Sequence, residues 1–422
     1  MNAEVKPGYK LTEVGMFPAD WELQTLQHVC REQITYGIVQ CGPHIPNGIP
    51  YIRVSDMDST QLTTDNMLRT SKEIASKFLR STVASGDIVY ALRGKLGEVR
   101  SVPSELAGAN LTQGTARLAP KETINSTYLL WSLREESFLK RSELEAKGST
   151  FREITLAGLR QQIIPVPPQQ EQALIATVLS DMDALISRLD QLITKKRNIQ
   201  QAAMQQLLTG QRRLPGFSGK WEVKRLGELI ELIPGGIYGS ELKTESLVGI
   251  AVATTAHIDS SDQWNNKEMS IRYFTPSQVD RYTPIDGDLI VVKSSGSAAS
   301  IQSGKVGFVD TCIAGTFIFS NFLMLLRPTN CVPKFLYYQL ISGRIKKMLP
   351  QLVEASTYPN IRINDYLEIS IPRPDVDEQV AIATVLSDMD TELATLEARR
   401  DKARQLKQGM MQELLTGRIR LI

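Results

Sequence analysis

Cysteine is scarce in this 422-residue chain, and no two cysteines form a CxxC pair. The four cysteines are Cys30, Cys41, Cys312 and Cys331. So few cysteines do not support a disulfide framework and are typical of a reducing compartment. The most apolar run, TFIFSNFLMLL at 316–326, is interrupted by Ser320 and Asn321, so it predicts a buried strand rather than a membrane span. No secretory signal follows Met1. We therefore expect a cytoplasmic protein with no membrane contact.

Signatures of catalysis and of cofactor binding are also missing. The Gly-Lys pairs at 94–95, 219–220 and 304–305 are followed by Leu, Trp and Val, so none forms the phosphate loop of a nucleotide-binding enzyme. The segment VPPQ at 166–169 lacks both the amide or acidic residue and the aromatic residue of an amino-methyltransferase motif. No glycine-rich turn connects a strand to a helix. We predict a non-catalytic chain with no cofactor of its own.

One group of residues has the composition of a metal site. His28, Cys30, Cys41 and His44 form an HxC pair followed by a CxxH pair, which zinc could bind. The same residues fit a strand followed by a loop, and the second half of the chain has no counterpart. We predict no metal site, and the sequence leaves metal binding by these four residues open.

A strong excess of positive charge is absent as well. The net charge is +2 and the pI about 8.2, whereas a protein that binds nucleic acid alone is usually more basic. Charge therefore neither requires nor excludes DNA. A protein that reads bases while its partners hold much of the phosphate backbone would have this balance.

The most informative feature that is present is an internal repeat. The segment IATVLSDMD occurs at 175–183 and again at 382–390, and the match continues at a constant offset of 207 residues to MQQLLTG at 204–210 and MQELLTG at 411–417. Upstream, Pro165, Pro167, Glu171 and Gln172 match Pro372, Pro374, Glu378 and Gln379 at the same offset. The chain is therefore a duplicated two-part molecule rather than a solenoid.

Each repeat predicts one long helix. Apolar residues recur alternately three and four positions apart from Val178 to Leu192. The second copy is weaker, because Glu392 and Arg399 interrupt its apolar series from Val385 to Leu414. No proline or glycine occurs between Gln169 and Leu208, and forty helical residues would span roughly 60 Å. Neither helix buries enough apolar surface alone. We expect the two helices to pack on each other as an antiparallel coiled coil with an internal pseudo-two-fold.

The segments before the helices predict mixed α+β domains. Each contains a Trp-Glu segment, a glycine-containing loop, short β-branched runs such as GDIVYAL at 86–92 and GDLIVVK at 287–293, and a helical stretch at 126–140 or 334–349. GKLGEV at 94–99 and GKVGFV at 304–309 are taken as equivalent. The predicted fold class is α+β, with two globular domains separated by two long antiparallel coiled-coil helices. The predicted boundaries are 1–167 and 211–374 for the domains, and 168–210 and 375–422 for the helices.

This arrangement resembles the specificity subunit of type I restriction-modification systems, the HsdS family. The resemblance covers essentially the whole chain and depends on the two PxPxxxEQ-to-LLTG blocks and on the Trp-Glu segments GMFPADWE at 15–22 and GFSGKWE at 216–222. The second Trp-Glu segment departs from the pattern, because Ser218-Gly219 stands where proline is expected. ITYGIVQCGPHIPNGIPYIRVSDM at 34–57 also looks like the opening of a target-recognition domain.

The resemblance implies a division of labour between domains and helices. Each domain would read one half of a bipartite, asymmetric site in double-stranded DNA, and the helices would set the spacing and dock the methyltransferase subunits. The implied partners are two adenine methyltransferase (modification) subunits and two restriction/translocase subunits. S-adenosylmethionine, ATP and Mg are expected on those partners, with no cofactor on this chain. The recognised bases, the spacer length and the presence of a nuclease subunit stay open.

Candidate DNA-binding residues lie in polar turns. In LRGKLG, Arg93 and Lys95 could reach a phosphate or a guanine edge, and the polar stretch 257–273 suits hydrogen bonding to bases. The candidates are Tyr36, Gln40, Arg53, Arg93, Lys95, Gln113, His257, Asn265, Asn266, Lys293, Ser295, Ser297 and Lys305. Ordinary solvated turns would have the same composition. The alternative function is a coiled-coil adaptor whose domains bind protein or glycan, which predicts no dependence on DNA sequence.

Overall fold

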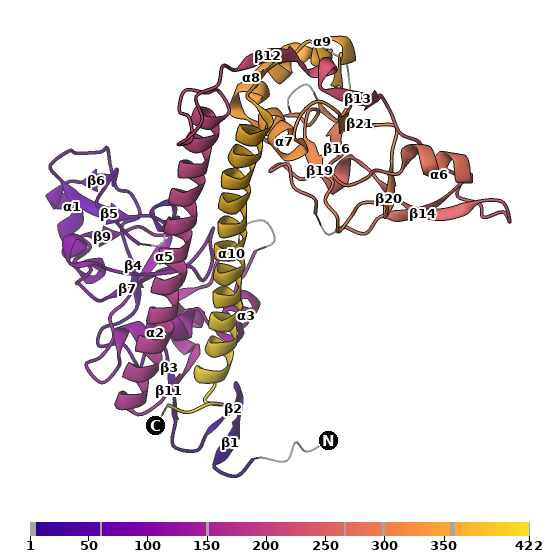
Figure 1. Ribbon diagram of the computed structural model, residues 1–422. Helices are drawn as coiled ribbons and strands as arrows, with labels where there is room; N and C mark the ends of the chain where they lie inside the picture. Colours follow the sequence, from indigo (N-terminus) through magenta and orange to yellow (C-terminus); the bar gives the residue numbers. More distant parts are fainter. Residues whose placement is uncertain are drawn as a thin grey trace. The chain divides into compact units, whose positions relative to one another are not determined.

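The computed structural model describes residues 6–59, 61–148, 152–265, 267–297, 300–354 and 359–421. The chain forms two compact units, of which unit 1 comprises Met1–Asp190 with Ala398–Ile422, and unit 2 comprises Gln191–Glu397. Each unit therefore combines a globular domain with part of each long helix (Figure 1).

The two long helices are α5, Gln169–Leu207, and α10, Val376–Leu414, with 39 residues each. At about 1.5 Å per residue, each is roughly 58 Å long. Asp375 caps the start of α10, because its Oδ1 accepts the backbone N–H of Glu378 at 2.9 Å. The two helices that the apolar periodicity predicted are confirmed.

The two helices run antiparallel in each unit. In unit 1, Leu179 near the start of α5 shares a buried cluster with Leu414 at the end of α10. In unit 2, Leu207 at the end of α5 shares a buried cluster with Ile382 near the start of α10. Because the start of one helix meets the end of the other in both units, the apolar seam that neither helix could bury alone is covered by its partner.

The globular part of unit 1 is built on two sheets. The larger sheet has the order β4-β10-β7-β8 and is antiparallel, and the smaller one has the order β6-β5-β9 with a parallel β5–β9 pair. The strand bounds are β4 Thr35–Tyr36, β5 Ile49–Ile52, β6 Arg69–Thr70, β7 Ile88–Ala91, β8 Val99–Ser101, β9 Asn110–Leu111 and β10 Thr115–Leu118. Two ribbons pair β1 Tyr9–Thr12 with β2 Gly15–Pro18, and β3 Glu22–Thr25 with β11 Ile163–Val166. The helices are α1 Lys72–Ser76, α2 Ser126–Leu133, α3 Glu136–Glu145, α4 Leu156–Gln161, η1 Val54–Met57, η2 Leu79–Ser81 and η3 Ser104–Leu106.

Unit 2 repeats this plan. Its larger sheet has the order β13-β21-β16-β19, and its smaller one has the order β15-β14-β20 with a parallel β14–β20 pair. The strand bounds are β13 Ile230–Ile233, β14 Val248–Ala253, β15 Ser270–Phe274, β16 Leu289–Val292, β19 Val306–Phe308, β20 Phe317–Phe319 and β21 Leu323–Pro328. Three ribbons pair β12 Glu222–Arg225 with β24 Ser370–Arg373, β17 Gly296–Ser297 with β18 Ser300–Ile301, and β22 Val353–Glu354 with β23 Asn360–Ile361. The helices are α6 Pro276–Tyr282, α7 Pro333–Ile341, α8 Gly343–Leu352, α9 Ile363–Leu367, η4 Leu226–Glu228 and η5 Thr255–His257.

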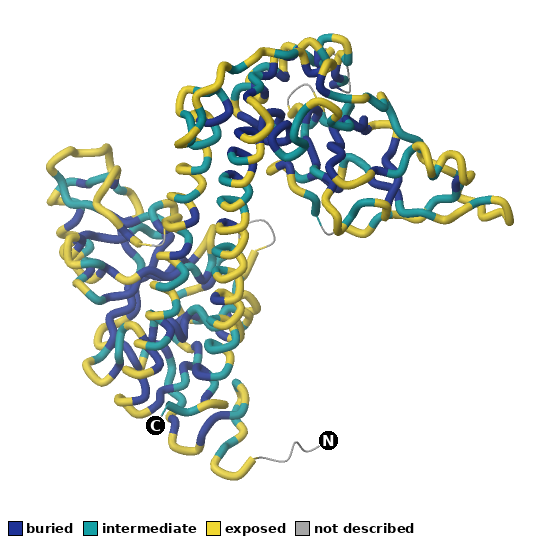
Figure 2. The backbone as a smooth tube through the Cα atoms, in the orientation of Figure 1, coloured by how far each residue is buried: buried dark blue, intermediate teal, exposed yellow. Residues whose placement is uncertain are grey.

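The central strand of each larger sheet, β7 or β16, is buried on both faces (Figure 2). In β7, Ile88 and Tyr90 belong to one apolar cluster, whereas Val89 and Ala91 belong to another. Successive side chains of a strand point to opposite faces, so β7 connects two cores. This explains why GDIVYAL and GDLIVVK are continuously apolar instead of alternating.

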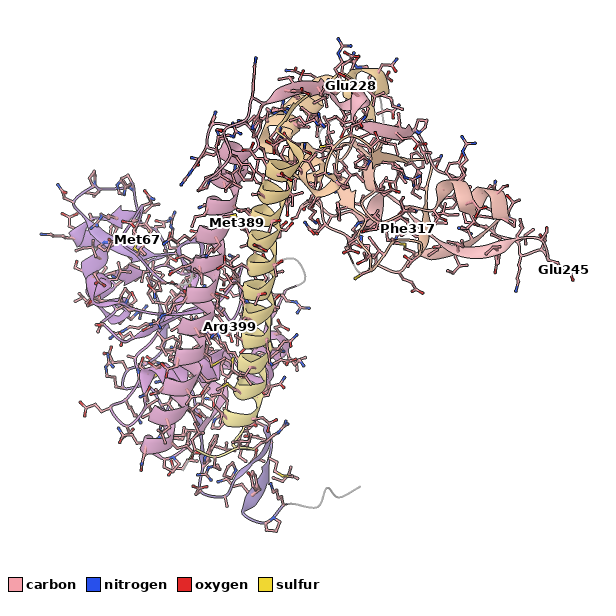
Figure 3. All side chains as sticks on the ribbon, viewed as in Figure 1. Met67, Glu228, Glu245, Phe317, Met389 and Arg399 are labelled. Atoms are coloured by element: carbon pink, nitrogen blue, oxygen red, sulfur yellow. The ribbon has the colours of Figure 1, made fainter. Side chains whose placement is uncertain are left out.

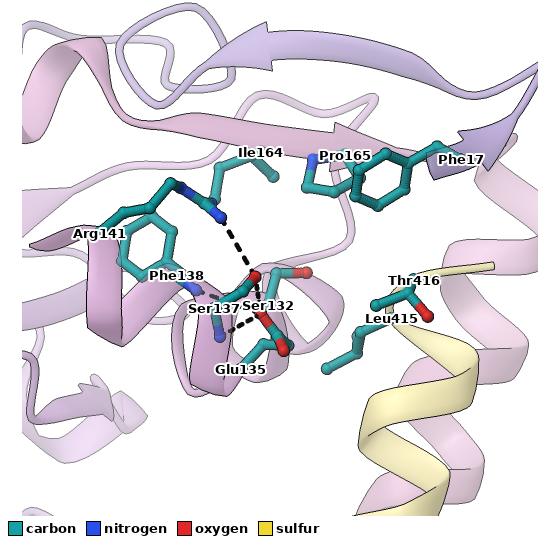
Figure 4. A pocket seen from close by; sticks show the side chains of 10 residues that line it. All are labelled: Phe17, Ser132, Glu135, Ser137, Phe138, Arg141, Ile164, Pro165, Leu415 and Thr416. Atoms are coloured by element: carbon teal, nitrogen blue, oxygen red, sulfur yellow. Dashed lines mark hydrogen bonds between the residues drawn. The ribbon is translucent and has the colours of Figure 1, made fainter. Parts of the chain in front are cut away.

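Some predicted elements are divided in the structure. The helical stretch 126–140 is two helices, because α2 ends at Leu133 and the Glu135 carboxylate accepts the N–H groups of Ser137 and Phe138 at the start of α3 (Figure 4). The stretch 334–349 is likewise split, at Ser342. The predicted strand 316–326 is two strands, β20 and β21. Residues 149–151 and 355–358 lie outside the described residues.

The assumed equivalence of GKLGEV and GKVGFV is wrong by three residues. Tyr90 pairs with Val99 across β7 and β8, and Val291 pairs with Val306 across β16 and β19. Gly97 is therefore the counterpart of Gly304, and both have positive φ, 83° and 88°. The two segments have similar sequences but are not structurally equivalent, because strand register and backbone conformation pair Gly97 with Gly304.

Candidate nucleic-acid interface

The turn between β7 and β8 brings several candidates of unit 1 together. The Lys95 Nζ lies 2.6 Å from the Asp58 Oδ1, next to η1. A Cβ atom on Gly114 would lie 3.4 Å from the Arg93 Nε, so Gln113 is adjacent to the same turn. The backbone N–H of Gln113 donates to the Ile38 carbonyl at 2.9 Å, which joins the segment containing Tyr36 and Gln40. Four separate segments thus meet at one end of the sheet.

Of the three cationic candidates of unit 1, Arg93 and Lys95 are exposed and Arg53 is half-buried, and each faces a carboxylate. Arg53 donates from Nε and Nη2 to the two oxygens of Asp56 at 3.1 and 2.6 Å, which raises the pKa of Arg53. Arg93 lies 3.9 Å from Glu153, and Lys95 pairs with Asp58 as above. The exposed pairs of Arg93 and Lys95 contribute little to stability. A phosphate or a base edge could therefore replace these two carboxylates at low energetic cost.

The equivalent turn of unit 2 is longer and less charged. It comprises residues 294–303 against residues 93–96 in unit 1, and it contains the β17–β18 ribbon. Ser295 and Ser297 lie in this turn, with Ser297 exposed. Lys293 precedes the turn, and its Nζ donates to the Pro234 carbonyl at 3.3 Å. Lys305 is half-buried and occupies the position of Glu98, not that of Lys95.

The polar stretch 257–273 is more internal than the sequence suggested. His257 is only 5% exposed, and its Nδ1 accepts the backbone N–H of Thr254 at 2.9 Å. Its ring therefore caps η5 from inside the loop instead of facing solvent. Asn265 donates from its side chain to the Ala256 carbonyl at 2.6 Å. Asn266 lies outside the described residues.

The HxC and CxxH residues do not converge. Cys30 is buried, which raises the pKa of its thiol to about 12, and His28 is exposed. His44 uses its Nδ1 to accept the backbone N–H of Arg69 at 3.1 Å. Within the described ranges, no three His, Cys, Asp or Glu side chains could hold a metal ion together. None of the helices in the described part of the chain combines the length and apolar character that a membrane-crossing segment needs.

Sequence reasoning missed an arginine that joins each Trp-Glu segment to a long helix. In unit 1, Trp21 donates its indole N–H to Glu171, and Arg420 pairs with the same carboxylate. In unit 2, Trp221, Glu378 and Arg213 form the same cluster. The signal was available, because Arg213 and Arg420 are also separated by the repeat offset.

The chain thus combines duplicated α+β units, two long antiparallel helices and a polar turn at one end of each larger sheet. The family described as "Type I restriction modification DNA specificity domain" matches residues 18–198 and 218–405. These two matches cover most of the chain, which therefore belongs to this family.

Similar proteins match the chain over most of its length. The chain is 25% identical over 371 residues to the type I restriction enzyme MjaVIII specificity subunit of Methanocaldococcus jannaschii, covering 82% of this chain and 84% of the relative. It is 24% identical over 427 residues to the putative MjaX specificity subunit of that organism, covering 98% and 97%. The crystal structure of the type I restriction-modification S subunit from M. genitalium shares the fold, with a TM-score of 0.57, 17% identity and 98% coverage of both chains.

The resemblance inferred from the sequence is confirmed. The chain is a type I restriction-modification specificity subunit whose role is recognition of a DNA sequence, and it is a non-catalytic subunit like its relatives. The α+β fold class with two long helices is confirmed as well. These comparisons do not support the alternative of an adaptor for protein or glycan.

Proposed function

We propose that each unit reads one half of a bipartite, asymmetric DNA site. The observation that supports this most directly is that the same end of the same sheet presents different polar residues in the two units. Unit 1 has Arg93 and Lys95 in a short turn, and unit 2 has Ser295 and Ser297 in a longer one. Different donors and acceptors at equivalent positions would select different bases, and each good bidentate contact discriminates by about 1–3 kcal/mol.

Contacts to the DNA backbone and to the bases would come from the exposed and half-buried candidates. Arg53, Arg93 and Lys95 in unit 1 and Lys293 in unit 2 are suited to phosphates or guanine edges. The polar candidates Tyr36, Gln40, Gln113, Asn265, Ser295 and Ser297 are suited to neutral hydrogen bonds. We leave His257 out of this set, because its ring is buried within its own loop.

The helices would hold the two half-sites apart and dock the partners. The identical segments IATVLSDMD at the starts of α5 and α10 offer two equivalent surfaces, which suits two methyltransferase subunits. Two restriction/translocase subunits would complete the complex, and S-adenosylmethionine, ATP and Mg would belong to those partners. A helical turn of DNA is about 34–36 Å, so helices of roughly 58 Å are long enough to separate two recognition sites.

Adenine-methylation mapping tests this function. DNA would be sequenced from cells that express this chain with the adenine methyltransferase encoded beside it, and from cells that lack only this chain. We expect one bipartite motif that disappears in the control. A stable complex with the methyltransferase that yields no motif would contradict DNA recognition, and the absence of any complex would favour the adaptor alternative.

A further inference from the structure

A loop follows η1 in unit 1 and η5 in unit 2, and in each unit it contains or contacts a candidate DNA-binding residue. In unit 1 this loop begins at Asp58, whose carboxylate pairs with Lys95 of the turn. In unit 2 it runs through Trp264 and Asn265, and the Asn265 backbone N–H donates to the His257 carbonyl at 3.0 Å. The position of each loop therefore affects a candidate DNA-binding residue, Lys95 in unit 1 and Asn265 in unit 2.

Arg100 of β8 holds the loop of unit 1. Its side chain is 10% exposed, and it pairs with Glu98 at 2.5 Å. Its Nε donates to the Ser59 carbonyl and its Nη2 to the Met57 carbonyl, both at 2.7 Å. Hydrogen bonds from a buried cation are stronger than neutral ones, and the guanidinium fork fixes the direction of both carbonyls.

Unit 2 has glycine at the same position of the fold. Arg100 pairs with Val89 across the sheet, and Gly307 pairs with Ile290 in the equivalent strands. The space beside Gly307 is filled by Trp264, since a Cβ atom on Gly307 would lie 2.8 Å from the Trp264 Cε2. The indole N–H donates to the Phe308 carbonyl at 2.7 Å, which ties the loop to β19.

Further contacts of the Trp264 loop point the same way. The Trp264 ring packs on Phe317, labelled in Figure 3, with 5.1 Å between ring centroids. Two residues earlier, Asp262 has a φ of 59° and is buried. Its Oδ1 accepts the Val306 N–H at 3.0 Å, and its carboxylate pairs with Lys346 of α8. The loop is thus fixed to the edge strand in both units, by the Arg100 guanidinium in unit 1 and by the Trp264 and Asp262 side chains in unit 2.

We propose that Arg100 and Trp264 are positioning residues, each of which sets the base selectivity of the half-site that its own unit reads. This inference rests on the proposed function. Arg100 is nearly enclosed and Trp264 is half-buried against Gly307, so each acts through the loop that it holds. Met57 and Leu62 of unit 1 remain anchored in the apolar core without the guanidinium, so its loss would shift the loop rather than unfold the domain.

Two pairs of variants test the proposal in the complete complex with the methyltransferase. Arg100→Met removes the guanidinium and Arg100→Lys keeps the charge with a different donor geometry. Trp264→Leu removes the aromatic ring, and Trp264→Phe keeps a smaller aromatic ring without the N–H donor. Methylation is mapped at sites that match the wild-type motif and at sites with one mismatch in either half. Each pair serves as the control for the other, because the Arg100 variants and the Trp264 variants are expected to change selectivity in different halves of the DNA site.

We expect Arg100→Met to increase methylation of sites mismatched in one half by about tenfold relative to matched sites, with the other half unchanged. Trp264→Leu should relax the opposite half, and the Lys and Phe variants should give smaller changes in the same halves. If the wild-type complex yields a motif and the variants keep the same base selectivity, this inference is overturned and the proposed function stands. Loss of the complex in all four variants would also overturn this inference, by showing a purely structural role. A wild-type complex with no motif would overturn the proposed function as well.

Discussion

Arg420 donates hydrogen bonds from Nε and Nη2 to the two carboxylate oxygens of Glu171, at 2.7 and 2.8 Å. Glu171 lies in the first turn of α5, whereas Arg420 follows the end of α10. Arg213 makes the same pair with Glu378, at 2.6 Å for both bonds. Each long helix is therefore fixed at its start by the segment that follows the other helix. This reciprocal contact explains why the repeat extends beyond the helices themselves.

Replacement of Arg420 with methionine should destabilise unit 1. The Glu171 side chain is fully buried, and among the described residues its remaining side-chain hydrogen bond without that cation comes from the Trp21 N–H. We expect the free energy of unfolding to fall by about 3 kcal/mol. Urea unfolding followed by tryptophan fluorescence measures this change. Arg418→Gln removes an exposed charge two residues away and should have a much smaller effect, so equal effects of the two variants would contradict the prediction.

Alanine at Gly304 should destabilise unit 2. Its φ of 88° disfavours any residue with a Cβ, and that Cβ would lie 2.5 Å from the Leu349 side chain. We expect a loss of about 2 kcal/mol in thermal or urea unfolding. Gly343→Ala, at the start of α8, meets nothing within 4 Å and should be neutral or slightly stabilising. A neutral Gly304→Ala would contradict the positive φ of Gly304 and its close contact with Leu349.

The cysteines should differ widely in reactivity. Burial raises the pKa of the Cys30 and Cys331 thiols to about 12, whereas Cys312 is exposed. Because alkylation requires the thiolate, iodoacetamide at pH 8 should modify Cys312 first and Cys30 slowest, as peptide mass spectrometry would show. The folded-state pKa values exceed the ordinary value of 9.0, so the free energy of unfolding should fall as pH rises from 9 toward 12. Rapid modification of native Cys30 would contradict its burial.

Lys95 should contribute to DNA affinity through charge. If Lys95 exchanges Asp58 for a phosphate, Lys95→Gln should weaken binding of the methyltransferase complex to all DNA sequences alike. The slope of log affinity against log salt should fall by about 0.9. Filter binding at several salt concentrations measures both. Lys140→Gln on α3, where Lys140 pairs with Glu136, removes an equal charge and should leave the slope unchanged. Equal slopes for wild type and Lys95→Gln would remove Lys95 from the candidate contacts.

The sequence predicted what depends on local pattern. The three-and-four spacing from Val178 to Leu192 was sufficient for α5, and the β-branched run GDIVYAL was sufficient for β7. Prediction from sequence failed where the structure depends on pairing between residues of different strands. The pairing of Val99 with Tyr90 fixes the register of the repeat, and no local pattern encodes that pairing.

The candidate contacts were harder to predict than the fold. A polar residue in a loop can face solvent or cap its own backbone, as the buried ring of His257 does, and composition cannot distinguish these outcomes. Arg100 and Gly307 show the same limit. The same position of the edge strand is Arg100 in unit 1 and Gly307 in unit 2, because the neighbouring loops pack against this strand differently.

The length of the paired helices should determine the gap between the two half-sites. Seven residues, about two helical turns, can be inserted into α5 between Thr194 and Gln200, with seven more in α10 between Glu392 and Glu397, so that the apolar seam keeps its phase. These segments face each other, because Lys196 pairs with Glu392 and Arg197 pairs with Glu397. The insertion adds about 10.5 Å of helix, or roughly three base pairs at about 3.4 Å each.

Methylation mapping of this variant should give both half-sites unchanged with a gap longer by about three base pairs. A matched control replaces the same surface positions without insertion and should keep the wild-type gap. An unchanged gap in a fully assembled complex would show that the helices do not measure the distance. Changed half-sites would instead show that the recognition surfaces depend on the helices, because Glu171 and Glu378 join the two kinds of element.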